Sequence, residues 1–497
     1  MTTVSDVLDR RVAAGVREHY DLYIGGEWVP SSSGGTRESV DPTTEQVVTT
    51  VADADEADVD RAVAVAAAAA PAWAALGWQE RARLLTELAD RVASHADELA
   101  RMDAVDAGIP VDGMAKDVAN AVNTMRYFAG IASELKGQTI EAGDGSLNMT
   151  LREPYGVVGR IVPFNHPIQF AASGVAGPLA AGNAVVLKPG DTTPVSALRL
   201  AELADGVLPP GVLNVVTGGL AAGVALVAHP GVPRIAFTGG VQSGRSVARA
   251  AAHHLKAVTL ELSGKNPLIV FPDANIPAVA AAAVRAMNFN RGQAQSCGSP
   301  SRMLVHESIR AEFVAELVRR VEALTIGDPL SPGIAMGPLA FAAHYERVLG
   351  YIDRGVAEGA RLVTGGGRPA TVGATGYFVA PTVFDDVTRD MAIAREEIFG
   401  PVVAVMGWTS EDEALSVANE LPVGLTANIW TNDVSTALRF GRAVQAGYVW
   451  VNGVGQRPLG APFGGYKLSG MGNENSLDEL LSFTQTKNLS INPAPAS

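Results

Sequence analysis

The sequence predicts an α/β protein built on two mostly parallel sheets. Its 497 residues are enough for two to four domains with substantial cores. A hydrophobic fraction of 47% and a charged fraction of 18% are typical of folded globular chains. Between residues 157 and 262, short apolar runs alternate with helical patterns five times, which indicates βαβ units.

The first 130 residues combine short strands with helices. Residues 21–52 contain β-rich runs separated by turn-forming clusters, SSSGG and DPTT. The alanine-rich tract 62–77 contains Pro71 and is shorter than the ~20 residues of a membrane span, so we expect a soluble helix there. Between residues 78 and 102, apolar residues recur at helical spacing and predict a helix with one apolar face.

The first alternating region carries an unusual set of residues after its strands. We expect strands near 157–162, 184–188, 212–216, 234–237 and 257–262, with helices such as 193–205 and 242–254 between them. The residues that follow or end these runs are polar or small: Asn165, Lys188, Asp191, Gly218, Gly219, Gly239, Gly240 and Glu261. Ligands bind outside the carboxyl ends of the strands in open α/β sheets, so we expect these residues to converge on one site.

A second alternating region spans about 267–452. Runs such as PLIVF, RMLVH, PVVAVM, ANIW and GYVWVN interleave with helical stretches at 308–324 and 434–444, and this pattern predicts a second α/β domain. Residues 482–491 resemble an exposed strand, whose unpaired edge favours pairing with another chain. We therefore expect a homo-oligomer.

Charge and cysteine content exclude several classes of protein. The 52 acidic and 38 basic residues give a net charge of −14, which disfavours nucleic-acid and anionic membrane surfaces as partners. A single cysteine cannot form an intrachain disulfide, so we expect a reducing, cytoplasmic location. No export signal is visible near the N-terminus, and no histidine or cysteine spacing predicts a metal site.

Cys297 and Glu261 are the candidate reactive residues. Cys297 lies in the small, polar segment NFNRGQAQSCGSPSR, where a nearby helix terminus is expected to lower the thiol pKa. Glu261 closes an apolar strand. The alternatives are that Cys297 is a buried apolar residue and that Lys265 neutralises Glu261. A nucleophilic thiol beside a carboxylate base favours acyl chemistry.

From about Tyr23 to Ile491 the chain resembles the NAD(P)-dependent aldehyde dehydrogenase superfamily. The matching segments are PFNHP (163–167), LAAGNAVVLKPGD (179–191), FTGGVQSG (237–244), ELSGKNP (261–267), the Cys297 segment, EEIFGPV (396–402) and PFGGYKLSGMG (462–472). The resemblance implies the aldehyde dehydrogenase fold. That fold has a Rossmann-like, parallel-sheet NAD-binding domain (1–131 and 151–259), a second α/β catalytic domain (260–480) and a small β oligomerisation arm (132–150 and 481–497) in a homodimer or homotetramer.

The resemblance also implies NAD-dependent oxidation of a small aldehyde to the carboxylic acid. Cys297 matches the nucleophile that attacks the aldehyde carbon to form a thiohemiacetal. Asn165, with the Cys297 backbone N–H, matches the donor pair that stabilises the oxyanion. Glu261 matches the base that activates water to hydrolyse the thioester, and Lys188 matches a lysine that acts at the catalytic centre and on a cofactor ribose.

The remaining implied site residues fall into two groups. The cofactor group is Val162, Pro163, Phe164, Lys188, Asp191, Gly218, Gly223, Phe237, Thr238, Gly239, Gly240, Gly244, Leu262, Glu397 and Phe399. The substrate-pocket group is His166, Gln169, Arg291, Ser296, Gly298, Arg457 and Phe463. Asp191 stands where the family often has glutamate, and its charge favours NAD over NADP. Ala294 stands where the family usually has glycine.

Arg291 and Arg457 bear on the substrate. If they face inward, a polar or carboxylate-bearing aldehyde fits better than a long aliphatic one; the alternative is that they point to solvent or pair with acids. Three other functions stay open: a coenzyme-A-acylating aldehyde dehydrogenase, a non-redox cysteine hydrolase, and a non-catalytic homologue. The matches at Glu261, Lys188 and Glu397 count against them.

Overall fold

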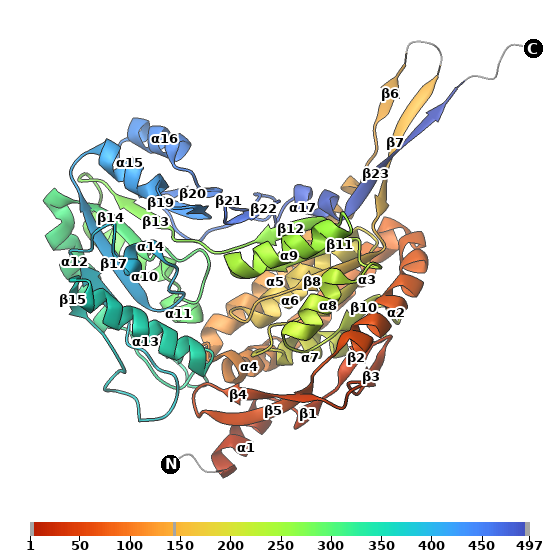
Figure 1. The fold of residues 1–497 in the computed structure, drawn as a ribbon, viewed down its shortest axis with the longest axis horizontal. Coiled ribbons are helices and arrows are strands. Elements are labelled where there is room, and N and C mark those ends of the chain that lie inside the picture. Colours follow the sequence, from red (N-terminus) through yellow and green to blue (C-terminus); the bar gives the residue numbers. More distant parts are fainter. Residues whose placement is uncertain (1–3, 143–145, 493–497) are drawn as a thin grey trace, which may run out of the picture.

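Two mostly parallel sheets, each covered by helices on both faces, form two lobes, and a β arm projects from one lobe (Figure 1). The computed structural model describes residues 4–142 and 146–492. The arrangement confirms the predicted α/β fold class with a separate β arm.

The first lobe is built on an eight-stranded sheet of order β22-β12-β11-β8-β9-β10-β2-β3. Its strands are β2 (Leu22–Ile24), β3 (Glu27–Val29), β8 (Val157–Ile161), β9 (Ala184–Lys188), β10 (Leu213–Val215), β11 (Arg234–Thr238), β12 (Ala257–Glu261) and β22 (Gly470–Met471). The central strands β12 to β10 are parallel, and all five strands predicted in this region are confirmed. Strand β22 pairs antiparallel with β12 although it lies in the segment assigned to the second domain. The proposed domain boundaries stay a prediction.

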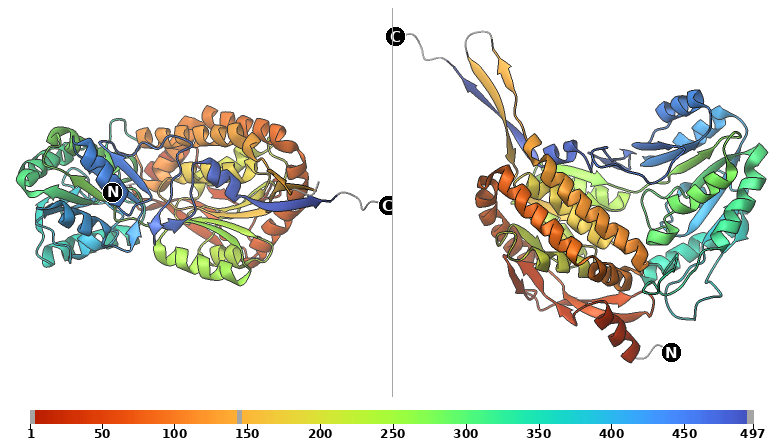
Figure 2. Two further views of the ribbon diagram at one scale, coloured as in Figure 1. Left: turned by 90° about the horizontal axis from the view of Figure 1, so that it is seen from above. Right: turned by 180° about the vertical axis from the view of Figure 1, so that it is seen from behind.

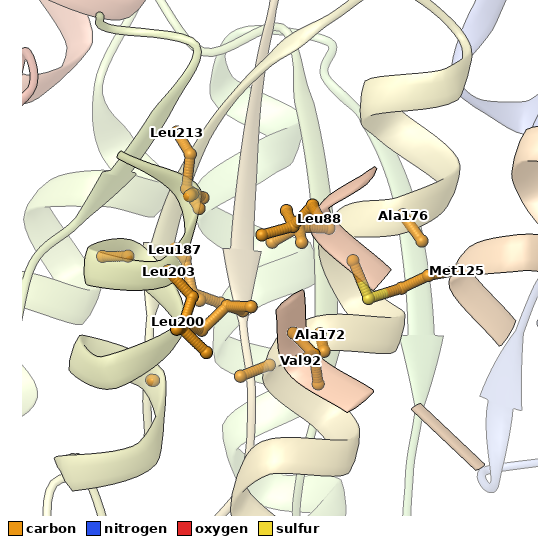
Figure 3. Close-up of a cluster of buried hydrophobic side chains, with 14 of the residues drawn as sticks. Leu88, Val92, Met125, Ala172, Ala176, Leu187, Leu200, Leu203 and Leu213 are labelled. Carbon is orange, nitrogen blue, oxygen red and sulfur yellow. The ribbon is translucent and has the colours of Figure 1, made fainter. Parts of the chain in front are cut away.

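Helices cover both faces of this sheet because its strands alternate buried side chains between two cores. One face packs against α2 (Glu56–Ala75), α8 (Leu220–Ala228) and α9 (Val241–His253). The other packs against α3 (Gly77–Ser94), α4 (Ala96–Ala107), α5 (Val111–Ile131), α6 (Pro167–Ala180) and α7 (Val195–Ala204). Leu187 of β9 points into the second of these cores with Leu88, Met125 and Leu200 (Figure 3), whereas Val186 points into the first.

The helix predicted for residues 78–102 is two helices. Helix α3 ends at Ser94, and His95 leaves the helical region at φ −111° and ψ 21°. A ring nitrogen of His95 lies 2.8 Å from the Arg91 carbonyl oxygen and satisfies an acceptor at the helix end. Among the described residues no single helix is long and apolar enough to cross a bilayer. Helices α2 and α3 taken together have the length and composition of a membrane span, but the chain bends by 115° between them.

The second lobe is built on a seven-stranded sheet of order β15-β16-β17-β14-β13-β19-β20. Its strands are β13 (Pro267–Val270), β14 (Arg302–His306), β15 (Arg361–Thr364), β16 (Thr382–Asp385), β17 (Val402–Trp408), β19 (Thr426–Trp430) and β20 (Tyr448–Val451). Helices α10 (Ile276–Ala286) and α12 (Glu307–Glu322) pack on one face. Helices α13 (Ala342–Ala357), α14 (Ala392–Arg395), α15 (Glu411–Asn419) and α16 (Val434–Ala443) pack on the other, which confirms the second α/β unit.

The remaining elements form the arm, two small sheets and four short helices. The small sheets are β1-β5-β4, with β1 (His19–Tyr20), β4 (Thr36–Asp41) and β5 (Gln46–Ala52), and β18-β21, with β18 (Val423–Gly424) and β21 (Tyr466–Lys467). The short helices are α1 (Val4–Ala13), η1 (Ala132–Glu134), α11 (Phe289–Gly292) and α17 (Leu477–Ser482). The arm contains β6 (Thr139–Glu141), β7 (Leu147–Pro154) and β23 (Thr484–Ile491), and it projects away from both lobes in every view (Figure 2). The exposed strand predicted at 482–491 is confirmed as β23. Parts of the predicted arm, 143–145 and 493–497, lie outside the described residues.

Carboxylates of α4 position two helices near the candidate site. Neither α6 nor α7 begins with a side-chain cap of its own. Instead, Asp103 accepts a hydrogen bond from the Ile168 backbone N–H at 3.0 Å, and Asp106 accepts one from Val195 at 3.1 Å. Both carboxylates are buried and satisfy orphan donors of a helix N-terminus. Helix α4 therefore fixes the start of α6, directly after Asn165.

Candidate active site

A cavity of about 690 Å³ opens at the carboxyl ends of the first sheet, and we call it the sheet-edge cavity. The residues that follow β8, β9 and β11 line it, as does Glu261 at the end of β12. The chain runs from β8 through β9 to β10 on one side of β8, and then returns to the other side of β8 for β11 and β12. Such a topological switch point is where open α/β sheets bind ligands, so the polar residues converge where the sequence predicts.

Twelve of the fifteen predicted cofactor residues line the sheet-edge cavity. These are Val162, Pro163, Phe164, Lys188, Asp191, Gly223, Phe237, Thr238, Gly239, Gly240, Glu397 and Phe399. Gly218, Gly244 and Leu262 do not line it. Gly244 lies against Leu262, because a Cβ on Gly244 would fall 2.5 Å from the Leu262 side chain. These two residues therefore pack α9 against the segment after β12, behind the cavity wall.

A second cavity, of about 790 Å³, lies between the lobes, and we call it the inter-lobe cavity. Residues of α5 and α6 line it from the first lobe, and residues 285–298 and 454–463 line it from the second. All seven predicted substrate-pocket residues are present: His166, Gln169, Arg291, Ser296, Gly298, Arg457 and Phe463. The two segments that the resemblance assigns to one pocket therefore do meet.

Cys297 and Glu261 lie where the two cavities meet. Both residues, together with Phe170, line both cavities. Cys297 is partly exposed, so its thiol is reachable rather than sealed in a core. The alternative that Cys297 is only a buried apolar residue is therefore contradicted. Asn165 lines the sheet-edge cavity beside them.

The backbone that carries Cys297 is held by side-chain amides. Asn266 donates from Nδ2 to the carbonyl oxygens of Cys297 at 2.6 Å and Ser299 at 3.1 Å. Asn165 donates from Nδ2 to the Gln295 carbonyl oxygen at 2.7 Å, which leaves its second amide hydrogen unused by the described residues. Ala294 adopts φ +59°, a region that favours glycine and costs alanine about 1–2 kcal/mol. The loop before Cys297 therefore keeps a left-handed backbone conformation at residue 294, although that residue is alanine.

Burial governs the protonation of the two reactive groups. Neither carboxylate oxygen of Glu261 has a hydrogen-bond partner of ordinary geometry among the described residues. Burial, and then the charge of Glu474, raises the pKa of Glu261 to about 8. Burial and the charge of Glu261 raise the pKa of the Cys297 thiol. The expectation that a helix terminus lowers the thiol pKa is wrong, because desolvation and a neighbouring carboxylate outweigh it.

Lys265 does not neutralise Glu261. Its Nζ is buried and has no hydrogen-bond partner among the described residues, and burial lowers the pKa of Lys265 to about 7. The charges that act on it are those of Arg302, Glu397 and Glu396. The alternative of a Glu261–Lys265 ion pair is therefore contradicted.

The two pocket arginines differ in their partners. Arg291 donates from Nε to Asp117 at 2.7 Å and from Nη2 to Gln169 at 2.9 Å, and Asp117 also lies 2.6 Å from His166 Nδ1. Arg457 makes no ion pair with a described residue and stacks on Phe463, its guanidinium carbon 3.9 Å from the ring centroid. The alternative that these arginines pair with an acid or point to solvent is therefore met by pairing for Arg291, whereas Arg457 lines the inter-lobe cavity and is exposed to solvent.

Several lining residues were not predicted. Phe170 lines both cavities, and Arg160 pairs with Glu474 at 3.0 Å in the lining of the inter-lobe cavity, which also includes Glu479. Arg160 is buried in the middle of an apolar strand, an unusual place for a cation, and that placement is the signal in the sequence. Nothing in the local sequence pairs it with Glu474. Among the described residues, no cluster of three or more His, Cys, Asp or Glu side chains is arranged to hold a metal ion.

The fold and the two cavities define a doubly wound α/β protein with a reachable thiol at the junction of two ligand-sized spaces. Residues 28–489 match the model of the aldehyde dehydrogenase family, and the chain belongs to that family. Its members are enzymes that oxidise aldehydes with nicotinamide cofactors.

Individual relatives match over nearly their whole length. Aldehyde dehydrogenase tropH of Talaromyces stipitatus is 42% identical over 95% of this chain and 93% of its own. Hydroxyisobutyraldehyde dehydrogenase of Mycolicibacterium austroafricanum is 43% identical over 96% of this chain and 94% of its own. The solved NAD⁺ complex of a Bacillus cereus aldehyde dehydrogenase is 39% identical, with a TM-score of 0.94 over 97% of this chain and 98% of its own.

Proposed function

We propose that this protein oxidises an aldehyde to its carboxylic acid with NAD, through a covalent intermediate on Cys297. The observation that carries the proposal is the junction: Cys297 and Glu261 each line both cavities. An aldehyde in the inter-lobe cavity and a nicotinamide in the sheet-edge cavity can then meet at one sulfur atom. A cysteine hydrolase has no use for the second cavity.

The sheet-edge cavity has the donors that a dinucleotide needs. Gly240 precedes the N-terminus of α9, and a Cβ there would meet nothing within 4 Å, so backbone N–H groups are open to a pyrophosphate. Lys188 and Asp191 lie at the end of β9, suited to a ribose, and Glu397 lies near the junction beside Phe399. When bound, NAD would accept a hydride from the substrate carbon.

Each residue near the junction of the two cavities has a separate role in the proposed reaction. The Cys297 thiol loses its proton to solvent, and the thiolate sulfur forms the S–C bond with the aldehyde carbon as the carbonyl π electrons move to oxygen. Asn165 uses its free amide hydrogen, with the Cys297 N–H, to bind the oxyanion. Once a thioester has formed, Glu261 as a carboxylate takes a proton from water, and the hydroxide displaces the sulfur. Lys188 lines the sheet-edge cavity and not the inter-lobe cavity, and its Nζ donates to the Pro189 carbonyl oxygen at 3.1 Å, so we assign it to hold a cofactor ribose rather than to act on the substrate.

Asn165→Ala is expected to lower kcat by roughly 10²–10³-fold, because one oxyanion donor is lost. Asn165→Ala and Asn165→Asp both also lose the hydrogen bond to the Gln295 carbonyl oxygen, so the melting temperature of each is measured beside kcat, and a rate loss at an unchanged melting temperature is assigned to the oxyanion donor. Single-turnover NADH formation measures both variants, and near-parental rates would contradict the assignment.

We predict NAD over NADP by about tenfold or more in kcat/KM. The carboxylate of Asp191 opposes a 2′-phosphate by up to ~4 kcal/mol at ~4 Å and an effective dielectric of ~20. Arg37 lies 3.6 Å from Asp191 and reduces that repulsion. Asp191→Asn is expected to lower the ratio of kcat/KM with NAD to kcat/KM with NADP. Equal kcat/KM values for the two cofactors in the parent protein would contradict this prediction.

The arm supports a homo-oligomer. One edge of β23 pairs with β7, and the side chains from Gln485 to Ile491 are exposed. Exposed Ile140, Leu147, Leu489 and Ile491 add apolar surface to the arm. Such an edge favours pairing with a second copy, in a dimer or tetramer. A catalytic thiol stays active in a reducing compartment, which favours the cytoplasm.

One assay tests the proposed function. The protein is mixed with NAD and a panel of aldehydes, and NADH is followed with and without coenzyme A. Turnover without coenzyme A supports the hydrolytic dehydrogenase. A strict requirement for coenzyme A would favour the acylating alternative, and no reduction with any aldehyde would favour a hydrolase or a non-catalytic homologue.

A further inference from the structure

The inter-lobe cavity has more basic than acidic side chains, although the chain as a whole carries a net charge of −14. Its basic lining residues are Lys116, Arg160, Arg285, Arg291 and Arg457. Two of them are neutralised, Arg160 by Glu474 and Arg291 by Asp117. Lys116, Arg285 and Arg457 are exposed at the cavity and have no hydrogen bond or ion pair to any described residue. The cavity therefore presents three solvated cations without an acidic partner, in a chain whose net charge is negative.

The acidic residues that line the inter-lobe cavity do not cancel its excess of positive charge. They are Glu261, Glu474 and Glu479. Glu474 is committed to Arg160, and Glu479 accepts a hydrogen bond from the Asn475 backbone N–H. Burial raises the pKa of Glu261 and of Glu479 to about 8, so both are largely uncharged at neutral pH. The cavity is therefore positive when the substrate enters.

Arg457 is the uncommitted cation beside the nucleophile. Its Nη2 lies 3.3 Å from the point where a Cβ on Gly298, the residue after Cys297, would stand. Its charge acts on both Cys297 and Glu261. Stacking on Phe463 holds the guanidinium plane and leaves its donor edges open. A planar fork with open edges matches a carboxylate, which it binds through two parallel hydrogen bonds.

We propose that Arg457 binds a carboxylate of the substrate, so that the preferred aldehydes carry an anionic group a few bonds from the aldehyde carbon. Lys116 and Arg285 attract such anions into the cavity. The inference rests on the proposed function, because it names the substrate class for that reaction.

The first test needs no aldehyde oxidation. Cys297 is the single cysteine, so its alkylation is followed by the mass of the intact protein. Iodoacetate and iodoacetamide differ in charge but use the same thiolate, which forms the S–C bond as iodide leaves. Relative to N-acetylcysteine, the iodoacetate-to-iodoacetamide rate ratio is expected to be higher in the parent protein. Arg457→Gln is expected to lower this ratio about tenfold, independently of any change in thiol pKa.

The alkylation test has a matched control variant and a result that would contradict the proposal. Arg101 is an exposed arginine of α4 that lines neither cavity, so Arg101→Gln is expected to leave the ratio unchanged. An unchanged ratio in Arg457→Gln would overturn the proposal. Because no cofactor takes part, this result separates failure of the anion subsite from failure of the dehydrogenase assignment.

The second test uses substrates matched in size. We expect a higher kcat/KM for 4-oxobutanoate than for its methyl ester, and an acid-to-ester ratio that falls about tenfold in Arg457→Gln, mainly through KM. Arg457→Lys is expected to restore part of that ratio, because it keeps the charge but loses the fork. Preference for the ester would overturn the proposal. A lower KM for glyceraldehyde 3-phosphate than for 4-oxobutanoate would assign the subsite to phosphate esters and overturn the carboxylate.

Discussion

Cys297→Ala is expected to abolish aldehyde-dependent NADH formation, with a loss of roughly 10⁴ to 10⁶-fold. The described residues that line both cavities are Phe170, Glu261 and Cys297, and of these the thiol is the one strong nucleophile. Without it, the aldehyde carbon has no covalent partner from which a hydride can leave. Continuous NADH absorbance at 340 nm measures the loss.

Control variants separate chemistry from folding. Cys297→Ser keeps the size of the side chain but offers a hydroxyl of far higher pKa, so a comparable loss is expected. Cys297 is partly exposed and is a small side chain, so both variants are expected to unfold within a few degrees of the parent. NAD binding, followed by fluorescence, is expected to persist. More than about 1% residual turnover in Cys297→Ala would contradict the covalent route.

Local pattern predicted the sheet that frames the site. The β-rich runs of the first alternating region became β8 to β12 within one or two residues, and the residues after them line one cavity. This part was predictable because burial on both faces makes a parallel strand a short continuous apolar run, and because its carboxyl end meets the same edge as its neighbours. Both properties depend on short stretches of sequence and not on contacts between distant segments.

Long-range contacts were not predictable from the sequence. The pair Arg160–Glu474 joins residues 314 positions apart, and Asp117 reaches Arg291 across 174 positions. These two contacts decide which cavity cations are neutralised, and so leave Arg457, together with Lys116 and Arg285, without an acidic partner among the described residues. The direction of the Cys297 pKa shift depends likewise on how the buried Glu261 packs beside it. The charges of the site residues therefore depend on which distant side chains pack against them, and the sequence motifs alone do not determine them.

Glu261→Gln is expected to give one burst of NADH, about one equivalent per active site, and then to stall. Acylation needs the thiol and the oxyanion donors, whereas hydrolysis of the thioester needs a base that glutamine does not provide. Rapid mixing with NAD and aldehyde measures burst and steady state separately. Hydroxylamine, added after the burst to protein freed of excess aldehyde, is expected to release the acyl group from Cys297 as a hydroxamate and to regenerate the free thiol. Turnover at the parental steady rate would remove Glu261 from the mechanism.

The same residue sets the expected pH dependence. Burial and Glu474 raise the pKa of Glu261 to about 8, and the base is the ionised form, which predominates above that pH. When deacylation limits the rate, kcat is expected to rise about tenfold per unit below pH 8 and to level off above it. Glu474→Gln removes the neighbouring charge and is expected to move the inflection to lower pH. An inflection that does not move would show that burial alone holds the proton on Glu261.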